Sequence, residues 1–392
     1  MTPSIIRKVE IVRFAYRVDG LGAADPSGRT LRTSYREGDS ITLNASAVAI
    51  ETRDGIRGEY VLLVNAFAHA QMAYLAPHLL NRDAEQRELI FDDLKRELRQ
   101  FDHMGHGPLN IALWDLAGKK YGCSVTKLLG GFRTKLAAYA STYHGDRSGG
   151  LHCKEAYADF ARHCREIGYR AFKIHGWHEG NRYEEAENVL HVAREVGDEM
   201  VLMLDPACEL RTFADALYVG QACDEAGYFW YEDPFRDAGT SAFAHRRLRE
   251  MIRTPLLITE HVRGIEPKAD FVLAGGTDFV RADPDYDMGI TGAMKIARFA
   301  EALGLDVEFH GAGPAQRHCI AATRNTNYYE VSLLGPKVKN LVPPVYLGDY
   351  SDQLECVDAD GNVPVPTGPG LGVTYDWSFI NANSVGREVF EA

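Results

Sequence analysis

The sequence predicts an α/β protein whose larger part is a closed barrel of alternating strands and helices, preceded by a smaller α+β domain. The chain has 392 residues, more than a single domain usually contains. From about Leu136 to Leu334, short apolar runs alternate with amphipathic stretches, which indicates successive βα units and a parallel sheet. An open doubly wound sheet is the main alternative. However, no G-x-G-x-x-G follows the first run, and eight nearly equal units favour closure.

Residues 1–133 have a different pattern and are expected to form the α+β domain. Residues 4–15 and 44–65 are predicted strands, and DAEQRELIFDDLKREL and PLNIALWDLAGKKYG are predicted helices. Between the first strands lies VDGLGAADPSGRTLRTSYREGDS, which is rich in Gly, Ser and charged residues. We expect a long mobile loop there, and such loops often act as lids.

Residues 134–335 contain the predicted barrel strands, and amphipathic helical stretches such as 183–196, 213–226 and 290–303 lie between them. In chain order the strands are KLAAYAS, YRAFKIHG, EMVLMLDP, GYFWYEDP, PLLITEH, DFVRADP, LDVEFHG and NYYEVSLL. Residues 336–392 carry Pro and Gly clusters and no clear helix. This C-terminal segment is expected to pack back on the first domain.

Composition argues against several classes of partner. The formal net charge of −12 disfavours nucleic acid and anionic membrane, since both require a basic face. The beginning, MTPSIIRKVEIVRFAYRV, lacks the apolar core and cleavage site of a signal peptide, and no run is as long as a membrane span. The seven cysteines are scattered and never form a CxxC pair, so we expect reduced, mostly buried thiols in a cytoplasmic protein.

Titratable side chains stand at the carboxyl end of nearly every predicted barrel strand. In a βα barrel these ends meet at one mouth, where the reacting groups sit. Taken singly, each has an ordinary structural explanation, because carboxylates cap helices and a lone His satisfies local hydrogen bonds. Agreement across consecutive units weakens that explanation. The residues are Lys173, His175, Asp205, Glu232, Glu260, Asp283, His310 and Glu330.

Three of these carboxylates are candidate ligands of one divalent cation. Asp205, Glu232 and Glu260 follow consecutive strands at nearly even spacing. With no accompanying Cys or His cluster, they suit a hard cation that prefers oxygen ligands. Mg²⁺ is therefore expected rather than Zn²⁺, and Mn²⁺ could substitute.

Two further pairs flank these carboxylates. Lys173 and His175 are two residues apart on one strand and therefore point to the same face. Beside a cation the pKa of Lys173 is expected to fall, which suits it to contact a substrate oxygen or to move protons, while His175 could equally be a hydrogen-bonded filler. Asp283 and His310 end neighbouring strands. A carboxylate there would fix the imidazole tautomer and raise its basicity, although a structural salt bridge would use the same pair.

These residues give the chain a resemblance to the enolase superfamily and, within it, to the mandelate racemase subgroup. The matching motifs are the K-x-H of AFKIHGW, the D of LMLDP, the E of WYEDP, the E of LITEH, the D of VRADPDYDMGIT and the H of VEFHG. ALWDLAGKKYGCSVTKLLGG is similar to the end of that family's capping domain. The resemblance covers essentially the whole chain. It implies a modified TIM barrel, (β/α)₇β, with an α+β capping domain completed by the C-terminal tail.

The resemblance also implies roles for the site residues. Asp205, Glu232 and Glu260 would bind Mg²⁺, Asp283 and His310 would form a His-Asp dyad, and Glu330 would hydrogen-bond the substrate carboxylate. The shared chemistry is abstraction of the proton α to a carboxylate, which gives an enediolate stabilised by the metal. Many subgroup members carry K-x-K with the second lysine as a base, whereas this chain has His175 at that position.

The preferred hypothesis is dehydration of a hydroxylated acid, such as a sugar acid, to a 2-keto-3-deoxy acid. His310, oriented by Asp283, would protonate the departing β-hydroxyl and could also act as base, with Lys173 or His175 on the other face. Racemisation or epimerisation of a 2-hydroxy acid is the alternative and needs two bases. A barrel that binds a metal and a carboxylate without turnover is a more remote alternative.

Substrate specificity is expected in the glycine-rich loop and at the barrel mouth. The loop offers Arg32, Tyr35 and Arg36 for hydroxyls or a distal carboxylate, although a solvated charged loop explains them equally well. The residues that follow strands and either line the cavity or simply pack are Tyr143, His144, Trp177 and His178. The partner is then a small-molecule carboxylate, and the resemblance implies a homo-oligomer, either a dimer or an octamer.

Overall fold

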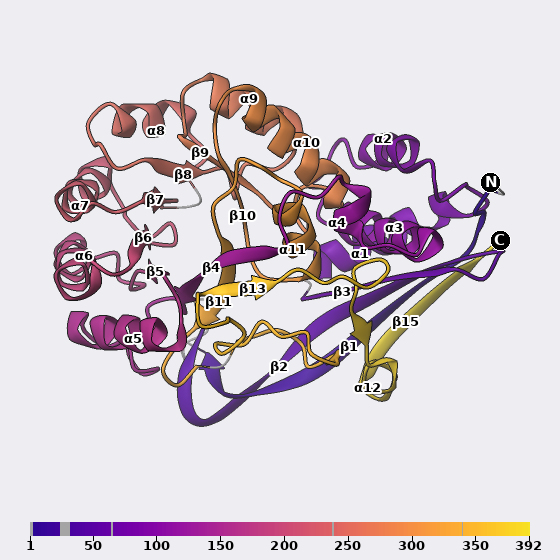
Figure 1. Cartoon of the computed structure of the whole chain (residues 1–392), viewed down its shortest axis with the longest axis horizontal. Coiled ribbons are helices and arrows are strands. Elements are labelled where there is room, and N and C mark those ends of the chain that lie inside the picture. The colour runs from indigo at the N-terminus through magenta and orange to yellow at the C-terminus, as the bar shows by residue number, and fades with distance from the viewer. Residues whose placement is uncertain (1–2, 24–31, 64–65, 237–238, 339) are drawn as a thin grey trace.

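The computed structural model describes residues 3–23, 32–63, 66–236, 239–338 and 340–392. A parallel β/α barrel forms one part of the molecule, and an antiparallel sheet covered by helices forms the other (Figure 1). The predicted fold class is confirmed.

The antiparallel sheet has the strand order β15-β1-β2-β3, so the last strand of the chain lies beside the first. Its strands are β1 (Ile6–Ala23), β2 (Thr33–Thr52), β3 (Arg57–Leu63) and β15 (Ser384–Glu391). The helices of this part are α1 (Ala66–Leu75), the short η1 (Ala76–Leu79), α2 (Arg87–Glu97), α3 (His106–Tyr121) and α4 (Val125–Leu128). Helix α3 lies so close to β3 that a Cβ at Gly58 would come 2.1 Å from the Ala112 carbonyl oxygen, so this position requires glycine.

The prediction of a mobile loop over residues 18–40 is wrong for most of its length. The ends of β1 and β2 occupy it and pair as a hairpin, with Leu21 opposite Tyr35, while residues 24–31 lie outside the described residues. Leu21 and Val18 are buried, whereas Asp19 between them is exposed. The many Gly and Ser residues nearby hide this strand pattern in the sequence. Figure 1 shows the hairpin extending from the capping sheet towards the barrel.

Parallel strands curl into the barrel in the ladder order β10-β9-β8-β7-β6-β5-β4-β11, and the two end strands also contact each other. The strands are β4 (Lys135–Thr142), β5 (Ala171–His175), β6 (Val201–Asp205), β7 (Trp230–Glu232), β8 (Leu256–Ile258), β9 (Phe279–Ala282), β10 (Val307–Phe309) and β11 (Tyr329–Leu334). Each of them was predicted. An apolar cluster joins one residue from each of five strands, namely Tyr139, Ala171, Met203, Trp230 and Leu257.

One helix lies between each two consecutive barrel strands. These helices are α5 (Lys154–Ile167), α6 (Arg182–Val196), α7 (Phe213–Ala226), α8 (Ala242–Arg249), α9 (Ile265–Leu273), α10 (Gly289–Ala302) and α11 (Pro314–Ala321). Helix α7 begins with a capping box, in which Thr212 and Asp215 bond each other's backbone N–H groups. No helix in the described part of the chain is both long and apolar enough to cross a membrane.

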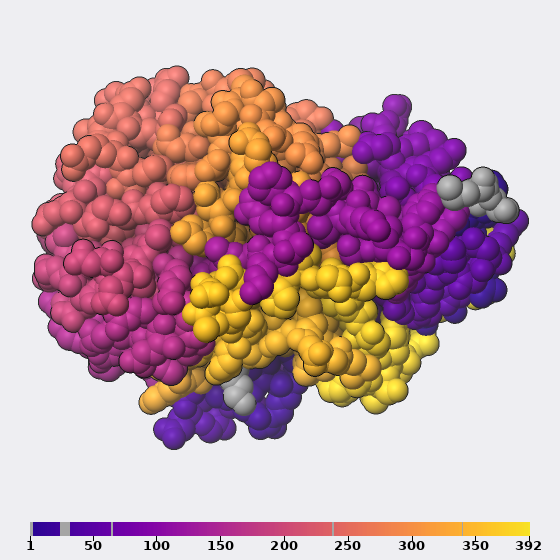
Figure 2. Space-filling view, viewed as in Figure 1, coloured from indigo at the N-terminus to yellow at the C-terminus, as the bar shows by residue number. Residues whose placement is uncertain are grey.

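The C-terminal segment runs over the junction between the two parts, where it is yellow in Figure 2. Its elements before β15 are β12 (Tyr346–Leu347), β13 (Asn362–Pro364), β14 (Thr374–Tyr375) and α12 (Trp377–Ala382). Strand β13 pairs with barrel strand β4 and β15 with β1, so the segment bonds to both parts. Helix α12 corrects the prediction that this segment has none. At six residues it is too short to show a helical period, and the Asp376 carboxylate caps it by accepting from the Phe379 N–H at 2.9 Å.

Candidate active site

Four charged side chains form a closed ring of ion pairs inside the barrel. Lys173 Nζ lies 2.9 Å from Glu232 Oε2 and 3.1 Å from Glu330 Oε1. Arg281 closes the ring, because its Nε lies 2.8 Å from Glu232 Oε1 and its Nη2 lies 3.0 Å from Glu330 Oε2. The four residues come from β5, β7, β9 and β11, alternate strands that share one layer of a barrel. All are buried, and each charge has two opposite neighbours that offset its desolvation.

The ring reverses the expectation for Lys173. Burial lowers the pKa of Lys173, but the Glu232 and Glu330 carboxylates outweigh it and hold the pKa well above its usual value. The predicted fall requires a cation beside the lysine and stays a prediction, whereas these ion pairs act in the opposite direction. Burial raises the pKa of Glu330 in turn, but Lys173 and Arg281 outweigh it and hold the pKa well below its usual value. Lys173 is thus a fixed cation beneath the barrel mouth.

His175 lies two residues further along β5 and contacts the end of β6. Its Nδ1 lies 2.6 Å from the Thr142 carbonyl oxygen, and because a carbonyl only accepts, Nδ1 carries a proton. Its Nε2 faces Asp205 Oδ2 at 3.1 Å. Burial raises the pKa of Asp205, but His175 and Lys173 outweigh it and hold the pKa below its usual range. Asp205 is therefore an ionised carboxylate beside the imidazole.

The structure brings the predicted dyad together. His310 Nδ1 lies 2.6 Å from Asp283 Oδ2, and His310 Nε2 lies 3.5 Å from Glu260 Oε1. Burial lowers the pKa of His310, but Glu260 and the bond to Asp283 raise it to about 9. Burial raises the pKa of Glu260, but His310 and His261 lower it to about 2. At neutral pH His310 is thus a cation that can donate a proton from Nε2.

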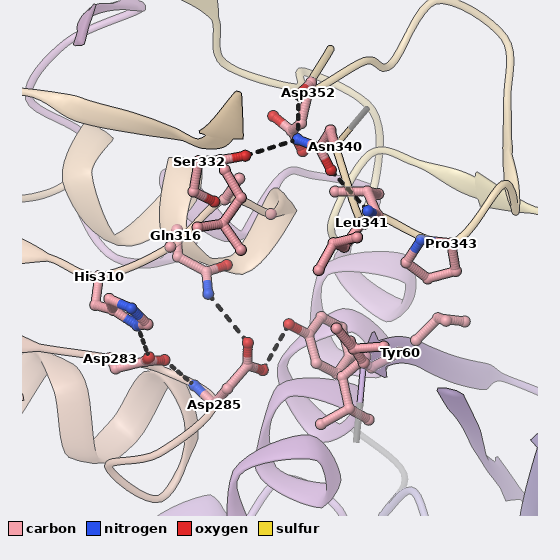
Figure 3. A pocket seen from close by; sticks show the side chains of 18 of the residues that line it. Tyr60, Asp283, Asp285, His310, Gln316, Ser332, Asn340, Leu341, Pro343 and Asp352 are labelled. Atoms are coloured by element: carbon pink, nitrogen blue, oxygen red, sulfur yellow. Dashed lines mark hydrogen bonds and ion pairs between the residues drawn. The ribbon is translucent and has the colours of Figure 1, made fainter. Parts of the chain in front are cut away.

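A tyrosine of the capping sheet reaches the back of the dyad (Figure 3). The Tyr60 hydroxyl donates to Asp285 Oδ1 at 2.7 Å, Gln316 Nε2 donates to Asp285 Oδ2 at 3.2 Å, and the Asp285 N–H donates to Asp283 Oδ1 at 2.7 Å. Burial and the nearby Asp283 raise the pKa of Asp285 to about 7. The orientation of Asp283 therefore depends on a contact between the capping sheet and the barrel.

A cavity of about 360 Å³ lies at the barrel mouth. The sequence-predicted residues that line it are His144, His175, Asp205, Glu260, His310 and Glu330. Lys173 and Glu232 lie below it as members of the ring, and Asp283 lines a smaller cavity of about 180 Å³ that also contains Tyr60. Two of the lining imidazoles, His175 on β5 and His310 after β10, thus lie around one group of carboxylates.

The three predicted metal ligands differ in their surroundings. Asp205 and Glu260 face the cavity, whereas both oxygens of Glu232 contact Lys173 and Arg281. Each carboxylate oxygen can accept two partners, so Glu232 can contribute to an ion without leaving the ring. These oxygen donors fit a hard divalent cation.

Sequence reasoning missed Arg281 and a second set of donors. Asp233 lines the cavity, and its Oδ2 is buried with no hydrogen-bond partner. Cys208 and His261 line the same cavity, so the expectation that no Cys or His accompanies the carboxylates is wrong. The signal was present in WYEDP and LITEH, where each predicted ligand is followed by another donor. The seven cysteines form no disulfide, but only Cys164, Cys223 and Cys319 are fully buried, fewer than predicted.

A second cavity of about 310 Å³ shares His144 with the first and contains hairpin residue Arg32. Arg32 Nη1 lies 2.9 Å from His178 Nδ1 and pairs with Glu209. Tyr143 also lines this cavity, and its hydroxyl lies 2.7 Å from Thr33 Oγ1. Burial lowers the pKa of His144 to about 3, helped by the nearby His175, so His144 is neutral.

Three predicted substrate-binding residues, Tyr35, Arg36 and Trp177, lie outside both cavities. The Trp177 indole N–H donates to the Leu151 carbonyl at 2.8 Å and its ring packs against Tyr157, which is a structural environment. Tyr35 lies under Lys337, and its N–H bonds Asp146. None of the three side chains lines the space where the titratable groups gather.

The mouth of the βα barrel holds ionised carboxylates, a charged His-Asp dyad and a second imidazole. These are the features of an acid–base enzyme. Residues 156–379 match the enolase C-terminal domain-like family, and residues 40–130 match the mandelate racemase / muconate lactonizing enzyme N-terminal domain. The first match alone spans more than half of the chain. The chain therefore belongs to the enolase superfamily, in its mandelate racemase and muconate lactonizing subgroup, and is an enzyme of that superfamily.

Named relatives include sugar-acid enzymes. The D-gluconate/D-galactonate dehydratase of Picrophilus torridus is 31% identical over 68% of this chain and 67% of its own length. The D-galactarolactone cycloisomerase of Agrobacterium fabrum is 30% identical over 83% of this chain and 87% of its own. Among solved structures, D-glucarate dehydratase from Agrobacterium tumefaciens, complexed with magnesium, matches with a TM-score of 0.82 and 27% identity, covering 98% of this chain and 100% of that one.

Proposed function

We propose that the protein is a Mg²⁺-dependent hydro-lyase that converts a hydroxylated sugar acid to a 2-keto-3-deoxy acid. The observation that carries the proposal is the position of His310, which lines the same cavity as His175 and whose Nδ1 is held 2.6 Å from Asp283 Oδ2. The dehydratases among the relatives support the same class of reaction.

Asp205, Glu232 and Glu260 are the proposed metal ligands. Mg²⁺, or Mn²⁺ in its place, would supply positive charge against the carboxylate oxygens of the substrate as its α-proton is lost. Glu330, which already accepts from the Gly311 N–H at 2.9 Å, lies on the cavity wall and is the proposed contact of the substrate carboxylate through a bridging water, because an ionised carboxylate only accepts hydrogen bonds. Lys173, charged beneath the cavity, adds a fixed positive potential.

In the proposed reaction the Asp205 carboxylate would bind the metal and so leave His175 Nε2 free to take the α-proton. His310 gives a proton to the β-hydroxyl, which leaves as water. The resulting enol becomes the 2-keto acid. His175 is better placed as base than Lys173, because His175 lines the cavity and Lys173 does not. Asp283 keeps the His310 Nδ1–H in place, so Nε2 is the atom that moves the proton.

Epimerisation is the second candidate, because two imidazoles from different strands reach one cavity. The two reactions are separated by incubating the protein and Mg²⁺ with mono- and diacid sugars in D₂O. Dehydration gives a 2-keto acid, and epimerisation gives α-deuterium without loss of water. His310→Asn should abolish dehydration while Mg²⁺ binding survives. A variant that still dehydrates at near wild-type rate, or the absence of both products with every sugar, would contradict the proposal.

The distal end of the substrate is proposed to lie in the second cavity, near Arg32, Tyr143 and His144. Because Glu209 pairs with Arg32, the net charge offered to a distal carboxylate is small, so hydroxylated monoacids and diacids both belong in the screen. Assembly into dimers or octamers is a separate prediction, measured by sedimentation velocity.

A further inference from the structure

Three donor atoms of different chemistry meet at the edge of the main cavity. Cys208, Asp233 and His261 lie on the loops that follow β6, β7 and β8, and one ligand atom of each lies within 4.8 Å of the others. The Cys208 N–H donates to the Asp233 carbonyl oxygen at 3.0 Å, which holds the first two loops together. The grouping is thus set by backbone contacts as well as by side chains.

The Asp233 carboxylate needs a partner that the described residues do not provide. Asp233 is 4% exposed, and its Oδ2 accepts no hydrogen bond. His261 Nε2 lies 3.6 Å from this oxygen, too far for a hydrogen bond. A buried carboxylate oxygen without a partner is costly, so an unsatisfied Oδ2 facing a cavity indicates a ligand.

The donor set specifies the ligand. A thiolate, an imidazole nitrogen and one carboxylate oxygen suit a borderline cation of tetrahedral preference such as Zn²⁺, whereas Mg²⁺ prefers oxygen alone. The adjoining Asp205 and Glu260 carboxylates offer that all-oxygen alternative. Two chemically distinct sets of donors therefore share one cavity.

We propose that Cys208, Asp233 and His261 form a second cation site, for a thiophilic divalent ion such as Zn²⁺, with its fourth position open to the cavity. On binding, the Cys208 thiol loses its proton to solvent and its sulfur bonds the ion, so one proton is released for each ion bound. The site is independent of the proposed dehydration, since it requires no sugar acid. An ion there occupies the space the substrate would enter, so Zn²⁺ inhibits turnover.

The test uses the full chain, freed of metal with a chelator and then saturated with Mg²⁺. Co²⁺ added as a probe should give a thiolate-to-cobalt charge-transfer band and release one proton per ion bound. Zn²⁺ added afterwards should abolish the band by displacing Co²⁺, without further proton release. Loss of an outer-shell partner of a metal ligand costs roughly 10–100-fold in affinity, so Cys208→Ser should weaken Zn²⁺ binding by about 100-fold or more in equilibrium dialysis. The matched control is Cys123→Ser, at a half-buried cysteine after α3 in the capping part, which should leave both readouts unchanged.

His261→Gln guards against a folding defect in the first variant and should give the same loss of Zn²⁺ affinity while the circular dichroism spectrum stays wild-type. The inference is overturned if the wild type shows no charge-transfer band, or if Cys208→Ser binds Zn²⁺ as tightly as Cys123→Ser does. A protein that acts on no sugar acid but shows a Cys208-dependent band contradicts only the proposed function. An active dehydratase without the band contradicts only this second site.

Discussion

Replacing Arg281 by methionine tests the ring of ion pairs beneath the cavity. Arg281 is fully buried and contacts Glu232 at 2.8 Å and Glu330 at 3.0 Å. Removing one partner of a buried ion pair costs about 3–5 kcal/mol, because the remaining charge is left desolvated. Lys173 still contacts both carboxylates in the variant, so we expect the lower end, about 3 kcal/mol.

The assay is urea unfolding followed by tryptophan fluorescence, to which buried Trp230 in the adjacent apolar cluster contributes. Arg162→Met is the matched control, because Arg162 pairs with Glu195 at 2.8 Å on the surface, and such pairs contribute about 0–1 kcal/mol. Adding Glu232→Gln to Arg281→Met should recover part of the loss, since it removes an unpaired charge. A loss below about 1 kcal/mol, or one equal to that of the control, would refute the reasoning.

Three other outcomes are expected. Glu260→Gln should lower Mg²⁺ affinity at least about tenfold in isothermal titration calorimetry, because losing a direct ligand should cost no less affinity than losing an outer-shell partner of a ligand. Unchanged affinity would show that Glu260 is not a ligand. Tyr60→Phe should cost about 1 kcal/mol for the lost bond to Asp285 and shift the pH–rate profile of the dyad; a profile identical to wild type would show that the capping sheet does not act on it. Burial raises the pKa of Glu185 to about 8, so with rising pH the unfolded chain loses the Glu185 proton at a lower pH than the folded chain does. The free energy of unfolding therefore falls between about pH 4.5 and about pH 8. Glu185→Gln should remove that fall, seen as a higher urea midpoint than wild type at pH 8 but not at pH 4, and parallel pH curves would contradict it.

The barrel could be predicted because strands and strand ends leave a regular mark on the sequence. Apolar runs followed by one titratable residue located His175, Asp205 and Glu260 correctly at the mouth. Arg281 was not predicted as a site residue. A charged side chain within the strand FVRA is stable inside the barrel only because Glu232 and Glu330, from other strands, pair with it. That pairing is long-range, and no local pattern records it.

The capping part was harder to predict for the same reason. The ends of β1 and β2 were taken for a loop because Gly and Ser are common there, yet their hydrogen bonds to each other and the contact of Tyr35 with Asp146 order them. Likewise the fall expected in the Lys173 pKa assumed a neighbouring cation, whereas the structure places Glu232 and Glu330 against its ammonium. In each case a partner distant in sequence reverses a local expectation.

The charges of the ring bear on why the cavity should hold a cation. Lys173 and Arg281 balance Glu232 and Glu330. Burial and the nearby Glu260 and Asp205 carboxylates raise the pKa of Asp233, which lines the cavity, well above its usual value. His310, with a pKa of about 9, offsets one negative charge. Because like charges in one buried site repel, the folded chain carries an electrostatic cost there that a bound divalent ion removes. An ion that binds only the folded state must stabilise it in proportion to the logarithm of its concentration, so unfolding in urea should depend on Mg²⁺ even when no substrate is present.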